Sequence, residues 1–195
     1  MAKKQTGLKQ VNVEIEGVAP LLMHRGLMAD PTDQWAAAIS EVKGKTKAAQ
    51  EKKSYIDFQG GLYHDDETGP YIPDFCLEKM VQDGAKKSKK GKEALAGVMC
   101  VDSRHPLIYD GPKDRDALYE DPRFRDRRIV VISRSRIPRV RPRFSEWALK
   151  FKLMINTETI NLSDVETAIH AAGQVIGLGD YRPKFGRFVL KKFQE

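Results

Sequence analysis

The chain has 195 residues, of which 41% are hydrophobic and 8% aromatic, so it can bury one sizeable core and is expected to form a single elaborated domain. Its net charge of +7 and its pI near 9.3 favour an anionic partner without naming one, because ribosomal, membrane-surface and heparin-type partners fit equally. Cys76 and Cys100 stand in neither a CxxC pair nor a metal-ligand spacing, which predicts reduced, partly buried thiols. Neither a signal peptide nor a transmembrane run is found, so we expect no membrane partner.

The first part of the chain is expected to hold an arm, a strand and a helix. Residues 1–10 are polar and carry lysines, which is typical of a flexible arm ahead of a domain at 11–195. Apolar and polar side chains alternate over residues 11–15, which predicts a half-buried strand. Residues 33–53 predict a helix, with Asp33 as its N-cap and lysines on its outer face.

His24 lies just after the first predicted strand. Its spacing to other residues gives it no partner with a clear catalytic role. A capping or solvent-facing histidine is the simpler interpretation, so His24 is kept only as a weak catalytic candidate.

A hairpin and a second helix follow. Aromatic residues flank a tight acidic centre within residues 58–73, which predicts the hairpin. His64 beside the carboxylates of residues 65–67 has the ligand types of a divalent metal site. Acidic hairpin tips are more often soluble turns, and we predict no metal. Asp74 is a good N-cap for the helix that is expected to end at Gly84.

A cationic segment comes next, ahead of an apolar stretch at 94–100 that fits helix and strand equally. The common interpretation of such a run is a flexible, solvated loop, and the sharper one is a phosphate clamp that becomes ordered on binding. The lysines that we select as candidate nucleic-acid contacts are Lys86, Lys87, Lys89 and Lys90.

The strongest chemical signal outside the tail is an arginine-rich segment that follows a buried strand predicted at 127–132. Its candidate contacts are Arg134, Arg136, Arg139, Arg141 and Arg143. Alternate residues of an extended chain share one face at a spacing of about 6.6 Å, which suits successive phosphates of a stretched single strand. Pro138 and Pro142 cannot donate to a central ladder, so we expect an edge strand or a protruding hairpin. An edge whose cations merely prevent aggregation is the alternative.

A strand, a helix and a strand complete the chain. Residues 147–155 show the clearest alternation in the sequence. Residues 163–176 predict a helix with Ser163 as N-cap and Glu166 as its capping-box partner. Residues 188–193 predict the last strand.

These elements predict an α+β fold with a ferredoxin-like core, built on a split β-α-β plan. The first strand, the helix at 33–53 and the strand at 127–132 form one half of that plan, and the last three elements form the other. The segment at about 60–126 is then an inserted hairpin and helix region, and the arginine-rich segment is a protruding hairpin.

The loop between the last helix and the last strand is rich in glycine. The order helix, loop, strand excludes a dinucleotide fingerprint or a P-loop, since both place the glycines ahead of a helix. We expect the loop amides to line a groove for a polyanion, with basic side chains assisting and aromatic ones exposed for base stacking. A helix C-cap at Gly177 followed by a tight connection is an equally weighted alternative. The candidate residues of the loop are Gly177, Gly179, Tyr181, Arg182, Lys184, Phe185 and Arg187.

The tail resembles the glycine-rich signature of a known protein superfamily. Ala171-Ala172-Gly173, Ile176-Gly177-Leu178-Gly179 and Phe185-Gly186-Arg187-Phe188 are similar to the signature of the repeat-associated mysterious protein (RAMP) superfamily, the CRISPR-associated RNA-binding proteins. The resemblance is specific over roughly 25 residues. This chain has Lys184-Phe185-Gly186 where the usual ending is Gly-Phe-Gly.

The resemblance implies a ferredoxin-like fold and nucleic-acid binding, either as a backbone subunit that coats a strand or as a repeat-cleaving endoribonuclease. It also fits a stand-alone or phage-borne relative. We therefore expect a non-catalytic protein of the bacterial or phage-infected cytoplasm that binds single-stranded RNA or DNA, without a cofactor, as a homo-oligomer or filament. Two alternatives stay open. One is a metal-independent RAMP-type endoribonuclease with His24 as general base, and the other is a structural protein whose basic face meets an acidic protein partner.

Overall fold

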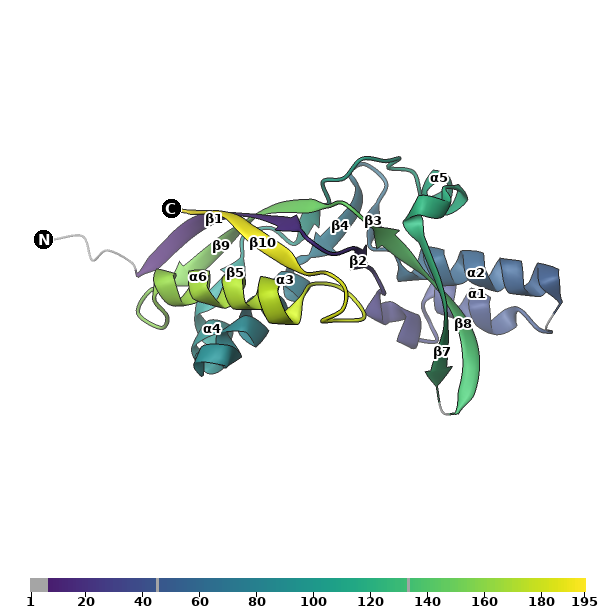
Figure 1. The fold of residues 1–195 in the computed structure, drawn as a ribbon, viewed down its shortest axis with the longest axis horizontal. Coiled ribbons are helices and arrows are strands. Elements are labelled where there is room, and N and C mark those ends of the chain that lie inside the picture. Colours follow the sequence, from purple (N-terminus) through teal and green to yellow (C-terminus); the bar gives the residue numbers. More distant parts are fainter. Residues whose placement is uncertain (1–6, 45, 133) are drawn as a thin grey trace, which may run out of the picture.

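Four strands form the largest sheet, in the antiparallel order β10-β1-β9-β5 (Figure 1). The computed structural model describes residues 7–44, 46–132 and 134–195. The strands of this sheet are β1 (Leu8–Gly17), β5 (Val98–Cys100), β9 (Ala148–Asn156) and β10 (Phe188–Gln194). The alternation predicted for the first strand and for 147–155 is confirmed, because alternate residues of β1 and β9 are buried.

Two helices cover this sheet. The helix predicted at 74–84 is α3 (Asp74–Ala85), and the one predicted at 163–176 is α6 (Leu162–Ala171), which continues into a π-helical turn, η4 (Ala172–Ile176). The two pack against each other, and their apolar faces join the buried core. Asn161 occupies the N-cap position of α6, so the capping box expected at Ser163 and Glu166 is wrong.

The elements that build the core differ from the expectation in two places. The strand predicted at 127–132 forms β7 (Arg125–Ile132), but β7 belongs to another sheet, and β5 pairs with β9 in its place. The helix that packs against β5 is α3, and not the one predicted at 33–53. The burial predicted for 127–132 from its β-branched residues is also wrong, because Ile129 and Val131 are each 69% exposed. Such a composition favours a strand but carries no information about which sheet the strand joins.

The helix predicted at 33–53 is in fact two helices, α1 (Gln34–Glu41) and α2 (Lys47–Gly61). Asp33 caps α1 as predicted, since its carboxylate accepts hydrogen bonds from two N–H groups of the first turn. The hydroxyl of Thr46 caps α2 by accepting one hydrogen bond, from the N–H of Ala49. Residues 43–47 hold no apolar side chain, so Gly44 after the last turn of α1 and Thr46 before α2 were the available signals of the break.

β7 and β8 (Ser135–Phe144) form the protruding hairpin that the prolines predicted (Figure 1). With β2 (Leu21–Leu22) they make a second sheet of order β2-β8-β7. The N–H of Val140 donates to the Asp57 carboxylate of α2 at 2.8 Å, so it points away from β7. Pro138 and Pro142 occupy the same edge of β8, two residues to either side, and have no N–H to offer. The edge of β8 that faces away from β7 is therefore left without open donors at these three positions.

A third sheet holds the remaining strands, β3 (His64–Asp65), β4 (Gly69–Pro73) and β6 (Arg104–Pro106), and it confirms the predicted hairpin. The ambiguous stretch at 94–100 is both helix and strand, the end of α4 followed by β5. The other elements are η1 (Gly26–Ala29), η2 (Lys86–Ser88), α4 (Gly91–Gly97), α5 (Arg115–Glu120) and η3 (Pro122–Phe124).

The arm predicted at 1–10 can be compared with the structure only over residues 7–10. Residues 1–6 lie outside the described residues, and Leu8 already begins β1. In the part of the chain that the structure describes, no helix is both long and apolar enough for a bilayer crossing.

Candidate nucleic-acid interface

The glycine loop, residues 177–187, lies between the large sheet and the sheet that contains the arginine hairpin (Figure 1). Five of its N–H groups are used inside the protein, namely those of Gly177 and Phe185 and the three that follow. Leu178 donates to the carbonyl of Gly186, Asp180 to that of Leu22, and Gly186 to that of Pro20, each at 2.8 Å. The expectation that the loop amides line a groove is therefore wrong for these five groups.

The glycines serve the packing of the loop itself. Gly179 and Gly186 have φ of 78° and 71°, which side-chain-bearing residues rarely adopt. A Cβ on Gly179 would lie 2.3 Å from the carbonyl oxygen of Leu22, and one on Gly186 would lie 1.7 Å from that of Leu178. The C-cap interpretation also fits, because the N–H of Gly177 donates to the carbonyl of Ala172 at 2.8 Å.

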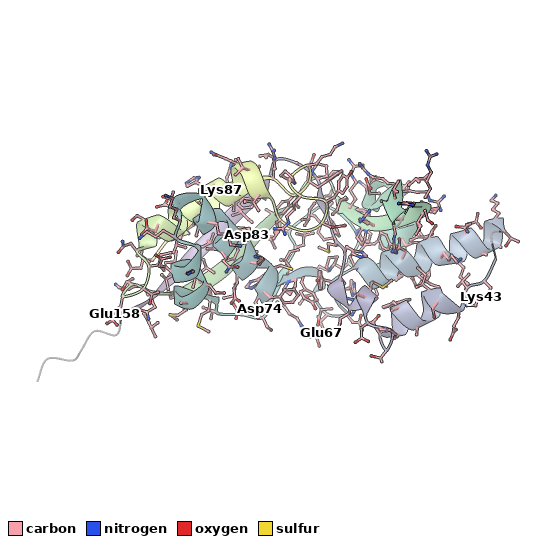
Figure 2. All side chains as sticks on the ribbon, turned by 90° about the horizontal axis from the view of Figure 1, so that it is seen from below. Lys43, Glu67, Asp74, Asp83, Lys87 and Glu158 are labelled. Atoms are coloured by element: carbon pink, nitrogen blue, oxygen red, sulfur yellow. The ribbon has the colours of Figure 1, made fainter. Side chains whose placement is uncertain are left out.

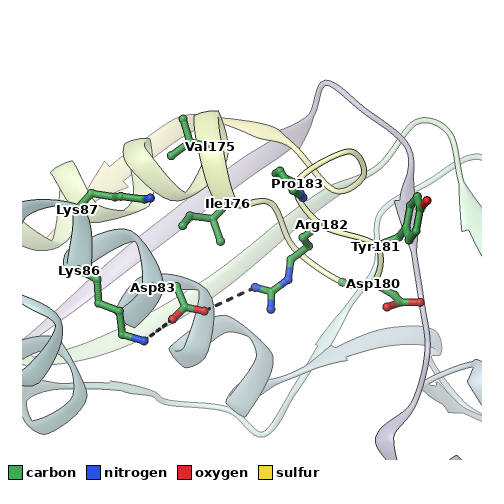
Figure 3. A pocket seen from close by; sticks show the side chains of 10 residues that line it. Asp83, Lys86, Lys87, Val175, Ile176, Asp180, Tyr181, Arg182 and Pro183 are labelled. Atoms are coloured by element: carbon green, nitrogen blue, oxygen red, sulfur yellow. Dashed lines mark hydrogen bonds and ion pairs between the residues drawn. The ribbon is translucent and has the colours of Figure 1, made fainter. Parts of the chain in front are cut away.

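The side chains of the loop face a groove. A cavity of about 690 Å³ lies between the loop and the cationic segment at the end of α3, which we call the lysine segment (residues 86–90) (Figure 3). Lys86 and Lys87 line one part of it, while Tyr181 and Arg182 line another. The structure thus brings together two candidate segments that are almost 90 residues apart in the sequence.

Asp83 links the two segments. Its carboxylate accepts hydrogen bonds from Lys79 and Lys86, both at 2.8 Å. It also lies 3.8 Å from the Arg182 guanidinium, and Figure 3 shows it between Lys86 and Arg182. Partial burial acts in the opposite direction, but the two lysine ammonium groups hold the pKa of Asp83 below its usual range. Sequence reasoning missed this residue. Its spacing of four from Lys79 and three from Lys86 was the available signal.

The lysine segment is a defined turn. Its first residues form the 3-10 helix η2, and Lys89 takes the left-handed conformation with φ of 63°. Lys89 is exposed, and the Lys90 ammonium lies 3.8 Å from the Asp164 carboxylate. The segment therefore has a fixed shape in this structure, which differs from the flexible loop that its composition predicts.

The arginines at the base of the hairpin face carboxylates of the protein. Arg139 donates to Asp57 at 2.8 Å, and Nε of Arg141 lies 2.5 Å from Oδ2 of Asp180. Nε of Arg143 is buried and makes no hydrogen bond within the described residues. These arginines alternate with buried residues and share one face, but two of them have an internal partner that the sequence did not reveal. The ion pair of Arg141 ties the hairpin to the glycine loop.

The tip of the hairpin is different. Arg134 and Arg136 are exposed there, on the part of the hairpin that projects from the molecule (Figure 1). Arg134 has φ of 67° at the turn. The five candidate arginines thus fall into an exposed pair at the tip and a partly buried set at the base.

Arg128 makes a second contact between the hairpin and the loop. The buried carboxylate of Asp126 holds its guanidinium through two hydrogen bonds of 2.6 and 2.8 Å. The guanidinium lies 4.7 Å from the ring centroid of Phe185 and 5.8 Å from that of Tyr181, a cation–π arrangement. Phe185 is only 6% exposed, so the expectation that it stands free for base stacking is wrong, whereas Tyr181 is 49% exposed.

The remaining basic residues of the loop lie at the surface. Lys184 and Arg187 are exposed, and the Arg187 Nε donates to the carbonyl of Pro183 at 2.9 Å. Arg128 was missed as a site residue, because its contact with the loop joins segments that are distant in the sequence and leaves no local pattern.

His24 lines a second, smaller cavity of about 260 Å³. Gly179, Asp180 and Arg182 border both this cavity and the groove. Burial lowers the pKa of His24, and nearby Asp180 opposes this only in part, so the imidazole is neutral at pH 7. The other chemically notable side chains of this cavity are Tyr63, Phe75, Cys76 and Lys79.

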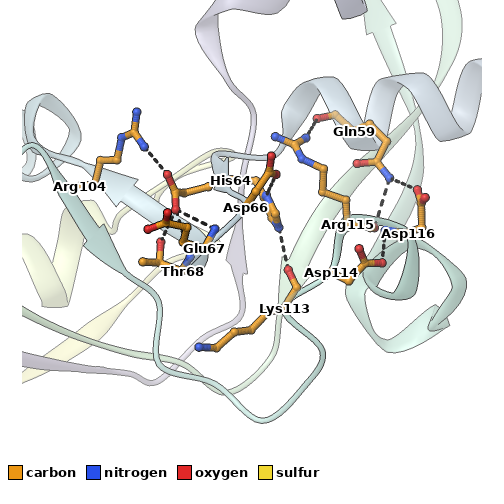
Figure 4. A network of polar contacts seen from close by, with 11 residues as sticks. Gln59, His64, Asp66, Glu67, Thr68, Arg104, Lys113, Asp114, Arg115 and Asp116 are labelled. Atoms are coloured by element: carbon orange, nitrogen blue, oxygen red, sulfur yellow. Dashed lines mark hydrogen bonds and ion pairs between the residues drawn. The ribbon is translucent and has the colours of Figure 1, made fainter.

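The acidic hairpin is a closed network of polar contacts (Figure 4). Asp65 accepts hydrogen bonds from the N–H groups of Glu67 and Thr68 and pairs with Arg104. The His64 ring lies 2.7 Å from the carbonyl oxygen of Lys113. Among residues 7–44, 46–132 and 134–195, no three His, Cys, Asp or Glu side chains are grouped so as to hold a metal ion. The hydrogen bonds of Asp65 fit the interpretation of this hairpin tip as an ordinary solvent-facing turn.

Comparison with known proteins gives a likeness in fold. No family model matches the sequence, and no curated protein matches it. The structure is similar to a chain in the cryo-EM structure of type III-B Cmr-beta bound to cognate target RNA, with a TM-score of 0.51 and 14% identity over 96% of this chain and 60% of that one. Cmr6 from Pyrococcus furiosus aligns with a TM-score of 0.43 and 10% identity, over 97% of this chain and 99% of that one. The protein spans about three fifths of the Cmr-beta chain, and the likeness to that chain is a likeness of fold.

Proposed function

We propose that this protein binds single-stranded RNA at the glycine loop and does not cleave it. The observation that carries the proposal is the meeting of three cationic segments at one loop. Lys86 and Lys87 come from the end of α3, Arg182 from the loop itself, and Arg128 and Arg141 from the hairpin. The fold likeness to a chain from a complex bound to target RNA supports RNA rather than DNA as the first ligand to test.

In this proposal the strand follows the groove. The lysines and Arg182 contact its phosphates, and the exposed ring of Tyr181 stacks on one base. The exposed arginines at the hairpin tip extend the same track, and further copies of the protein bind next to one another along the strand. The large sheet is proposed to be a ferredoxin-like core of two β-α-β units, β1-α3-β5 and β9-α6-β10, within one domain.

Salt dependence tests the phosphate contacts. We expect the affinity for a labelled RNA of about 20 nucleotides, measured by fluorescence anisotropy, to fall by roughly 0.7 log unit per contact for each log unit of salt. The double variant Lys86→Ala/Lys87→Ala should reduce that slope by about 1.4. Lys43→Ala/Lys47→Ala is the matched control, because Lys43 lies at one end of the molecule, far from Lys87 (Figure 2). A flat salt response, or equal losses in both double variants, would contradict the proposal.

Two further measurements test the preference for RNA over DNA and the number of protein copies bound to one strand. A DNA of the same sequence should bind more weakly than the RNA under matched conditions, and tighter DNA binding would reverse the assignment. Light scattering on complexes with RNAs of about 20 and 60 nucleotides should show more copies on the longer strand, in proportion to its length. One copy on both would contradict coating.

One observation favours a second candidate function, a metal-independent endoribonuclease. His24, Tyr63 and Lys79 line the same cavity, and a neutral imidazole is the form that acts as a general base. The test is incubation of labelled RNA with the protein in the presence of a chelator. Intact RNA supports the non-cleaving role. Cleavage by the wild type that His24→Ala abolishes would replace it with this second candidate.

A further inference from the structure

We propose that the smaller cavity beside His24, which we call the base cavity, receives one unstacked nucleobase of the bound strand, while the phosphate of that nucleotide lies in the adjoining groove. The inference rests on the proposed function and deepens it, because it assigns a subsite for a base next to the phosphate contacts. Its first support is the shared border. Gly179, Asp180 and Arg182 line both cavities, so a nucleotide at the loop has its two ends on either side of the same three residues.

The groove carries basic side chains, which suit a phosphate, whereas the base cavity is largely apolar, which suits a base. The groove is wide and carries the lysines, whereas the base cavity has about 260 Å³ and a largely apolar lining that includes Met23, Ile72 and Leu178. That volume lies just below the usual range for drug-sized ligands of about 300–1,000 Å³, which suits one planar ring system better than a whole nucleotide.

Two aromatic rings stand at the base cavity. Phe75 is 56% exposed, although it is a large apolar side chain. Its ring centroid lies 6.2 Å from that of Tyr63 in an edge-to-face arrangement. Single-stranded RNA is commonly held by unstacked bases that lie against aromatic side chains, and an exposed phenylalanine beside a cavity supplies such a surface.

His24 supplies the hydrogen bonds that a base requires. A neutral imidazole carries one donor and one acceptor, and the edges of nucleobases present the same two kinds of group. No hydrogen bond joins the His24 ring to another residue of the described part of the chain, and only burial and more distant charges act on it. Burial of a base against His24 would therefore break no hydrogen bond between the ring and the described residues.

Abasic scanning tests the inference on the unmodified protein. One nucleotide at a time in the RNA is replaced by an abasic unit, and the affinity is measured by anisotropy. We expect two positions to lose affinity, one for the base stacked on Tyr181 and one for the base in the cavity, the latter by about tenfold, within the range measured for a single base–aromatic stack. A scan in which every position behaves alike, in a protein that binds RNA with the expected salt slope, would overturn the base cavity and leave the proposed function standing. Absence of any RNA binding would overturn both.

Two variants locate that base. Phe75→Ala should lose about tenfold in affinity for intact RNA and should remove the loss at the position of the cavity base from the abasic scan, while the loss at the base stacked on Tyr181 remains. The ratio to wild type should stay constant with salt, because no phosphate contact is removed. Leu95→Ala is the matched control, since Leu95 is 68% exposed on α4 and lines neither cavity. If Phe75→Ala binds like the control, or if an excess of nucleoside monophosphates displaces the RNA completely, the assignment to a base of the strand is wrong.

Discussion

Buried carboxylates hold the cationic side chains of this protein in position. The side chains of Asp57 and Asp126 are 5% and 7% exposed, and each is paired with an arginine of the hairpin. Asp57 also accepts the N–H of Val140, so it satisfies both a charge and a backbone donor. The arrangement of these arginines therefore depends on residues that have no visible relation to them in the sequence.

Replacement of Asp57 tests that dependence. We expect Asp57→Ala to lower the free energy of unfolding by about 3 kcal/mol, because it leaves the Arg139 charge and the Val140 N–H without a partner. Urea denaturation followed by circular dichroism measures the loss. Lys52→Ala, an exposed change on the same helix, should stay within about 0.5 kcal/mol of wild type. A loss for Asp57→Ala as small as that of the control would show that the pair is not structural.

A second prediction about single residues concerns the glycines of the loop. Gly186→Ala should destabilise the protein by more than about 2 kcal/mol, since it combines a positive φ with a Cβ placed against the carbonyl of Leu178. Gly26→Ala is the matched control, because a Cβ there meets nothing within 4 Å. Thermal unfolding compares the two variants. Equal melting temperatures would mean that the loop tolerates a side chain at Gly186 and that its packing does not require glycine there.

At the scale of elements, the hairpin separates two tasks along its length. The arginines at its base are tied to Asp57 and Asp180, whereas Arg134 and Arg136 at its tip are exposed. Pro138, Pro142 and the bonded N–H of Val140 leave no open donor on the edge of β8 that faces away from β7. Contacts with α2 and with the loop hold the shape of the hairpin. The tip is free to meet a ligand without a change in that framework.

A pair of double variants checks the division. Arg134→Ala/Arg136→Ala should leave the melting temperature unchanged and reduce the salt slope of RNA binding by about 1.4, one contact for each arginine. Arg139→Ala/Arg141→Ala should lower the melting temperature, because it leaves the Asp57 and Asp180 carboxylates without their partners. If the tip variant is the less stable of the two, the division is wrong.

Much of the arrangement of strands and loops could be predicted from the sequence. Period-two alternation located β1 and β9, and Pro138 and Pro142 indicated the protruding hairpin. The partners of each strand could not be predicted, because β5 has only three residues and too short a pattern to compete with the longer run of β7. The loop was located correctly, but the use of its amides depends on carbonyls of Pro20 and Leu22 from another part of the chain.

At the scale of the whole molecule, two histidines link folding to pH. Burial lowers the pKa of both His24 and His105 below that of a free imidazole. His105 is 2% exposed and packs edge-on against Phe151 of the large sheet. The unfolded chain therefore takes up these protons at a higher pH than the folded one, near pH 6.5.

The free energy of unfolding should consequently be constant above about pH 7 with respect to these two groups and should fall as the pH drops below about 6.5. Urea denaturation at a series of pH values above and below about 6.5 measures how steeply the free energy of unfolding falls with pH. His24→Asn and His105→Leu should each reduce it. A slope that neither variant changes would mean that other groups control the acid sensitivity.

The net positive charge predicted an anionic partner, but the placement of that charge had to come from the folded chain. Lys86 and Arg182 are almost a hundred residues apart, and Asp83 joins them only after α3 and the loop have packed side by side. The base cavity depends even more on folding, since His24, Phe75 and Leu178 come from three separate segments.

The three residues that border both cavities have a thermodynamic consequence. Because Gly179, Asp180 and Arg182 line both cavities, we expect occupancy of one cavity to be coupled to occupancy of the other. Coupling of this kind is reciprocal. By whatever factor a phosphate tightens the hold on a base, the base tightens the hold on the phosphate by the same factor.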